Sequence, residues 1–124
     1  MNIMPSTTNH KVFHVKTEEE FDQILQRAAE NSITVFVKFS AVWCGPCKRI
    51  APLYEKLADI YNMCVFLSVD VDEIEAISTR YNIKSLPTFI VCRNNTYSEL
   101  MKGANPDKLH ELVKNQIPVR QTTL

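Results

Sequence analysis

The sequence predicts an α/β protein with a central mixed sheet that has helices on both faces. Three observations support this prediction: strand-like and helix-like segments alternate along most of the 124 residues, two strand-like segments are largely apolar, and a tight turn joins the last two strands. Alternating strands and helices favour a parallel sheet covered on both sides. The final hairpin adds antiparallel pairing, so we expect a mixed sheet.

The first half of the chain contains two strand-helix units. Residues 12–15 are a short expected strand, and a Thr-x-x-Glu capping pattern begins a helix over residues 17–30. Apolar residues recur in that helix at helical spacing and predict one buried face. Residues 33–39 are rich in β-branched side chains, as in a strand buried on both faces, and a helix over about 46–60 follows directly.

The second half begins with another buried strand, over residues 64–69. A helix over 72–81 is expected to follow, with Asp72 as its N-cap and Glu75 three positions later. The pattern of a strand followed by a helix therefore occurs a third time.

A hairpin and a helix complete the predicted fold. Residues 88–91 are strand-like, and a turn at 93–95 leads to an antiparallel edge strand over 97–101. An Asn-Pro pair opens the last helix, over about 105–115. We expect one domain over residues 10–117 between flexible tails, 1–9 and 118–124.

Charge and hydropathy narrow the class of partner. The 14 basic and 14 acidic residues balance and are interspersed, so no basic face for nucleic acid is predicted. No apolar stretch approaches the ~18 residues of a membrane span, and no signal peptide is visible. We expect an intracellular protein of a reducing compartment, the cytosol or the mitochondrion.

The most informative local pattern is a pair of cysteines, Cys44 and Cys47, at the expected junction of a strand and a helix. Peptide dipoles and free N–H groups at a helix N-terminus stabilise a thiolate, so this position favours disulfide exchange. The alternatives are a structural disulfide and half of a metal site. A zinc site needs about four ligands, and the other cysteines and histidines form no second closely spaced pair. The pattern predicts a redox pair and no metal.

The chain resembles the thioredoxin family from about residue 12 to residue 117. Three separated features occur in the family's order: Ala-Val-Trp-Cys-Gly-Pro-Cys-Lys at 41–48, Leu-Pro-Thr at 86–88 and Gly-Ala at 103–104. The resemblance implies a thioredoxin fold, in which four helices flank a five-stranded mixed sheet. It also implies reduction of disulfides in other proteins, without a cofactor.

In the implied mechanism, Cys44 is the nucleophile that attacks a target disulfide, and Cys47 is the resolving cysteine that releases the reduced target. Cys44 is expected to be the more exposed of the two, because Cys47 lies about one turn inside the helix. Gly45 and Pro46 contribute the shape of the motif. The resemblance implies that Trp43 covers the pair and contacts targets.

The remaining site residues are also implied by the resemblance. Asp72 matches the acid that accepts the indole N–H, although a helix cap explains it too. A cis peptide at Leu86–Pro87 leaves the Leu86 backbone free to pair with an extended target. A trans proline opening a strand is the alternative, because only about 5% of X–Pro bonds are cis. Thr88 and Gly103 complete the expected substrate-binding residues.

Lys38 is the main departure from the family, which usually has a buried aspartate at this position. A buried ammonium is costly, so Lys38 either extends its amine to water or titrates with a lowered pKa and can act as a base. We hypothesise that it tunes the pKa of Cys47: a charged Lys38 stabilises the Cys47 thiolate and favours the dithiol form. Ser68 likewise stands where relatives often carry a charged partner.

Two functions remain open. The first is a monomeric protein-disulfide reductase that acts on disulfide-containing proteins and is recharged by a flavoprotein or other dithiol reductase. The alternative is a redox-attenuated binding or scaffold module, suggested by Lys38 and Ser68. A disulfide isomerase is less favoured, because Pro46 resembles reducing members of the family.

Overall fold

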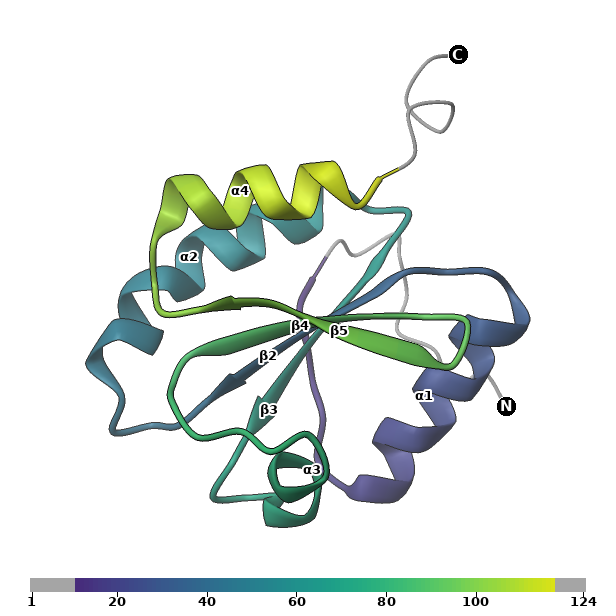
Figure 1. Ribbon diagram of the computed structural model, residues 1–124, viewed down its shortest axis with the longest axis horizontal. Coiled ribbons are helices and arrows are strands. Elements are labelled where there is room, and N and C mark those ends of the chain that lie inside the picture. The colour runs from purple at the N-terminus through teal and green to yellow at the C-terminus, as the bar shows by residue number, and fades with distance from the viewer. Residues whose placement is uncertain (1–10, 118–124) are drawn as a thin grey trace.

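A computed structural model describes residues 11–117 (Figure 1). The expected tails, 1–9 and 118–124, lie outside this range, as does residue 10. The strands are β1 (Phe13–His14), β2 (Val35–Ser40), β3 (Val65–Asp70), β4 (Thr88–Arg93) and β5 (Thr96–Lys102). The helices are α1 (Glu18–Glu30), α2 (Gly45–Ile60), α3 (Glu75–Arg80) and α4 (Pro106–Asn115).

The strands form one sheet in the order β1-β3-β2-β4-β5. The central strand β2 pairs in parallel with β3 and antiparallel with β4. At the edges, β1 pairs in parallel with β3, and β5 pairs antiparallel with β4. The predicted five-stranded mixed sheet with four helices is therefore confirmed.

Helices cover both faces of the sheet, with α2 and α4 on one side and α1 and α3 on the other (Figure 1). Phe36 of β2 packs in the cluster that contains residues of α2 and α4, whereas Val37 and Phe39 pack in the cluster with α1 and α3. Because side chains alternate along a strand, Lys38 shares the α2 face with Phe36. The alternation of side chains along β2 thus places Lys38 on the face covered by α2, the helix that begins at the two cysteines.

The caps of α1 and α4 form as the sequence predicts. The Thr17 hydroxyl accepts the N–H of Glu20 at 3.0 Å, and the Glu20 carboxylate accepts the N–H of Lys16 at 2.8 Å. In α4, the Asn105 side chain accepts the N–H of Lys108 at 3.0 Å. Each contact satisfies a backbone donor that has no partner within its helix.

The predicted start of α3 is wrong. The helix begins at Glu75, and Ile74 is at the N-cap position without a side-chain hydrogen bond. The Asp70 carboxylate accepts the N–H groups of Asp72 and Glu73, at 2.8 and 3.2 Å, and holds these residues in a turn. Asp72 is therefore not a cap, and its own carboxylate is free for another donor.

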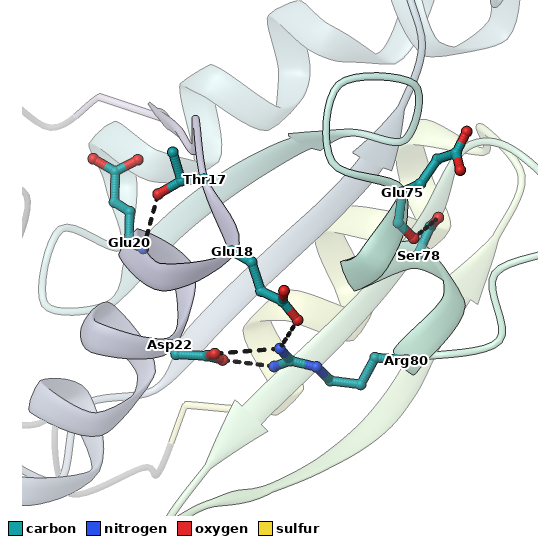
Figure 2. A network of polar contacts seen from close by, with 7 residues as sticks. All are labelled: Thr17, Glu18, Glu20, Asp22, Glu75, Ser78 and Arg80. Carbon is teal, nitrogen blue, oxygen red and sulfur yellow. Dashed lines mark hydrogen bonds and ion pairs between the residues drawn. The ribbon is translucent and has the colours of Figure 1, made fainter.

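An ion-pair network joins α3 to α1 (Figure 2). Arg80 at the end of α3 donates to Asp22 and to Glu18, each at 2.6 Å. Both acids lie in the first two turns of α1. The two helices on this face of the sheet are thus connected by one guanidinium group.

Candidate active site

The site is built where β2 ends and α2 begins. Cys44 is the N-cap of α2, and its sulfur accepts the N–H of Cys47 at 3.2 Å. The two residues form a disulfide, with their Cα atoms 5.3 Å apart. The same N–H group and the helix dipole stabilise negative charge on the Cys44 sulfur when the disulfide is reduced.

Exposure does not distinguish the two cysteines, contrary to the sequence-based expectation. Cys44 is 4% exposed and Cys47 is 3% exposed. They differ instead in the groove that each lines. Cys44 lines a groove of about 670 Å³, here called the tryptophan groove, whose wall includes Trp43, Cys44, Pro46, Asp72, Glu75 and Leu86. Cys47 lines a second groove of about 510 Å³, the lysine groove, with Lys38, Lys16, Lys48, Ser68 and Asp70.

Trp43 forms the rim of the tryptophan groove. It is 68% exposed, and the neighbouring Val42 is also exposed. Its indole N–H donates to the Asp72 carboxylate at 2.8 Å, which fixes the ring although most of it faces solvent. This contact is the one that the resemblance implies. An ordered apolar surface therefore lies next to Cys44.

Residues 45 and 46 form the first turn of the helix. Proline suits this position, because the missing N–H would have no helical partner. A Cβ at Gly45 would contact only the Arg49 side chain, at 3.7 Å, so the local packing leaves room for a side chain there.

The loop before β4 lies against the cysteines. The Leu86–Pro87 peptide bond is cis, and Leu86 packs against Cys44 and Cys47. The Gly103 N–H, at a φ of 96°, donates to the Pro87 carbonyl at 2.9 Å. The hydroxyl of buried Thr88 donates to the Ser85 carbonyl at 2.7 Å. Of the four expected substrate-binding residues, Leu86 alone lines the tryptophan groove, and the other three support its loop.

Lys38 is buried on the face of the sheet beneath α2. It is 6% exposed, and its amine lies 5.3 Å from the centre of the Tyr54 ring. Most of the side chain is therefore buried, although Lys38 also lines the lysine groove. Burial lowers the pKa of Lys38, and attraction to Glu55 opposes this effect. Ser68 lies directly opposite Lys38 in the register of β2 and β3.

Sequence reasoning missed much of both groove walls. Ser78, Thr79 and Ile83 line the tryptophan groove, and Asp70 and Glu73 line the lysine groove. Local spacing carries no signal for the first group. Asp70 was detectable, because alternation on β3 places it on the same face as Ser68.

Cys64 and Cys92 are buried, unpaired thiols. Burial raises the pKa of Cys64 to about 11 and that of Cys92 to about 12. At pH 8, only about one Cys64 thiol in a thousand is ionised. We expect iodoacetamide to leave both thiols unmodified in the reduced, folded protein and to alkylate them after unfolding. Peptide mass spectrometry measures this, and rapid native alkylation at either position would contradict the prediction.

Two other features are absent from residues 11–117. Among residues 11–117, no group of three histidine, cysteine, aspartate or glutamate side chains is placed to hold a metal ion. In the same part of the chain, no helix is long and apolar enough to cross a membrane.

Comparisons with known proteins agree with the geometry. The model of the thioredoxin family matches residues 12–115. Thioredoxin 1 of Plasmodium falciparum is 43% identical over 100 residues, which cover 81% of this chain and 92% of that protein. Thioredoxin-1 of Caenorhabditis elegans is 38% identical over 100 residues, with 81% and 85% covered.

Solved structures give the same result. The structure of P. falciparum thioredoxin has a TM-score of 0.79 at 40% identity, covering 86% of this chain and all of that one. The structure of Schistosoma mansoni thioredoxin has a TM-score of 0.81 at 34% identity, covering 91% of this chain and 100% of that one. The range matched by the family model includes the whole sheet and both cysteines.

Proposed function

The chain belongs to the thioredoxin family and is a thiol-disulfide oxidoreductase that reduces protein disulfides, and we propose that Cys44 is its nucleophile and Cys47 its resolving cysteine. The Cys44 thiolate attacks a target disulfide, forms a mixed disulfide and releases one target thiolate. Cys47 then attacks the Cys44 sulfur, which frees the second target thiolate. Cys44 and Cys47 end as a disulfide, and the target has gained two electrons.

One observation carries this assignment: the Cys44 sulfur caps α2 and lines the tryptophan groove, whereas Cys47 lines the lysine groove. A target approaching Trp43 and Leu86 meets Cys44 first. The exposed indole and the fixed Leu86 loop supply apolar contacts for an extended target segment. Asp72 supports this surface by holding the indole N–H, and Pro87, Thr88 and Gly103 hold the loop.

The partners follow from the chemistry. The oxidised pair must be reduced again before a second turnover, and we propose a flavoprotein or other dithiol reductase as the electron donor. We place the protein in a reducing compartment, the cytosol or the mitochondrion, where the two unpaired thiols at Cys64 and Cys92 stay reduced. We also propose that the protein acts as a monomer.

The test is to trap the mixed disulfide. The reduced Cys47→Ser variant, mixed with a model protein disulfide, should accumulate a covalent adduct through Cys44, because nothing resolves it. Mass spectrometry of the non-reduced peptides identifies the linked cysteine, and dithiothreitol should reverse the adduct. Cys64→Ser is the matched control and should turn over without accumulating adduct. Adduct formation through Cys47 in Cys44→Ser, at the rate of the first reaction, would reverse the assignment.

A further inference from the structure

The lysine groove brings a second titratable group to the resolving cysteine. Lys38 comes from β2 and Cys47 from the first turn of α2, and both line the same groove. The groove has a volume of about 510 Å³, whereas a water molecule occupies ~30 Å³. The groove therefore has room for water molecules beside both side chains.

The Lys38 amine forms no ion pair in the part of the chain that the structure describes. The ion pairs found there join Arg80 to α1 and Lys102 to Glu99. The contact of Lys38 is with the Tyr54 ring, whose hydroxyl already donates to the Leu67 carbonyl at 2.8 Å. A cation in this environment is only partly compensated, and burial favours the neutral amine.

Other titratable groups face this groove or act on Lys38 from the elements packed around it: His14, Lys16, Lys48, Glu55, Asp70 and Glu73. Most of them are exposed, and Asp70 is half-buried, so water and salt screen their charges. Lys38 is the buried amine of the set. It is therefore the group whose protonation the protein interior controls most strongly.

We infer that the neutral Lys38 amine accepts the thiol proton of Cys47 in the step that releases the reduced target. This inference rests on the proposed roles of Cys44 and Cys47. The proton moves from the Cys47 sulfur to the Lys38 nitrogen and leaves a thiolate beside an ammonium. The Cys47 thiolate then forms a bond to the Cys44 sulfur, and the bond from Cys44 to the target sulfur breaks. The departing target thiolate takes up a proton from the Lys38 ammonium or from water.

An amine base has a consequence that a carboxylate base does not. Proton transfer to Lys38 creates two opposite charges in a buried place, and their attraction stabilises the Cys47 thiolate. Transfer to a carboxylate would instead leave a neutral acid. The lysine thus links the formation of the attacking thiolate to the formation of its counter-ion.

Two substitutions separate proton acceptance from simple charge. Lys38→Met keeps a long apolar side chain but removes the amine, and Lys38→Arg keeps a cation that cannot lose its proton. Lys56→Met makes the same chemical change on an exposed lysine that lines neither groove and serves as the matched control.

The experiment is a single turnover of each reduced protein with excess model disulfide peptide, quenched in acid and resolved by mass spectrometry. At pH 7, we expect both Lys38 variants to slow release from the mixed disulfide by on the order of 10²-fold. Formation of the mixed disulfide through Cys44 should change by less than about threefold, since a catalysed proton transfer is removed only from the second step. Lys56→Met should match the parent in both steps.

The dependence of the release rate on pH gives a second readout. Release in the parent should rise with pH and level off as Lys38 loses its proton, whereas Lys38→Met should keep rising to higher pH, following the Cys47 thiol alone. Near-ultraviolet circular dichroism and thermal unfolding check the fold of each variant.

Several results would overturn the inference. Release in Lys38→Arg at the parent rate would mean that charge alone is sufficient, and release in Lys38→Met at the parent rate would mean that the amine has no role. If the variants do not fold, the parent alone tests the inference. A release rate whose dependence on pH follows the titration of the Cys47 thiol alone would overturn it. Absence of any mixed disulfide in Cys47→Ser is a different failure, because it removes the proposed function itself.

Discussion

Cys44→Ser should abolish the reduction of a model protein disulfide, with a loss in kcat/KM on the order of 10³-fold or more. A serine hydroxyl is not ionised at neutral pH, so the nucleophile at the start of α2 is lost. Cys47 is not expected to replace it, because Cys47 lines the other groove. The measurement is turnover with dithiothreitol as the electron donor.

The matched control for this experiment is Cys64→Ser, which removes a buried thiol that lines neither groove. This control should retain the parent rate if it folds. Substantial turnover by Cys44→Ser would show that the assigned nucleophile is wrong. Equal, negligible turnover by the parent would instead favour the scaffold alternative, which the comparisons with thioredoxins do not favour.

Tyr54→Ala should have the largest effect on stability, a decrease of about 3–5 kcal/mol in the free energy of unfolding. Tyr54 is fully buried, and its ring packs against Phe66 and Phe89 with centroid distances of 5.4 and 5.6 Å. Its hydroxyl donates to the Leu67 carbonyl. The substitution leaves a cavity between α2 and the sheet. Urea unfolding followed by circular dichroism measures the change.

Two comparison variants divide this effect into its parts. Tyr54→Phe keeps the ring and loses the hydrogen bond, and we expect a cost of about 1–2 kcal/mol. Tyr97→Ala removes a tyrosine that is 55% exposed, and its effect should stay within about 1 kcal/mol. A Tyr54→Ala variant as stable as Tyr97→Ala would show that the α2 face of the sheet does not depend on this ring.

The strands and most helix ends were predictable because their signals are local. The alternation in β2 and β3 and the caps Thr17 and Asn105 depend on neighbours within about four residues. The start of α3 was mispredicted because Asp70 accepts the N–H groups of Asp72 and Glu73 and holds these residues in a turn. Asp72 has the residue type of a cap, but the competing donor is the indole of Trp43, 29 positions away in the sequence.

The site was predictable to a similar extent. The spacing of Cys44 and Cys47 identifies the chemistry, and the burial of Lys38 follows from its place in an apolar strand. The contact between Lys38 and Tyr54 does not follow, because it depends on how α2 lies across the sheet. The division of the two cysteines between two grooves could not be predicted from the sequence either, because each groove wall combines residues from several elements.

The ion pairs of Arg80 have a consequence for target binding. α3 has six residues, too few for a helix to persist by itself in water, and it contributes Glu75, Ser78 and Thr79 to the wall of the tryptophan groove. By joining α3 to Glu18 and Asp22, the guanidinium group restrains this wall before a target arrives. Without this restraint, α3 would lose conformational entropy when a target binds. With it, α3 loses that entropy when the protein folds, so the free-energy cost of binding is lower. Arg80, which touches neither cysteine, thus preorganises the surface on which we propose that targets dock.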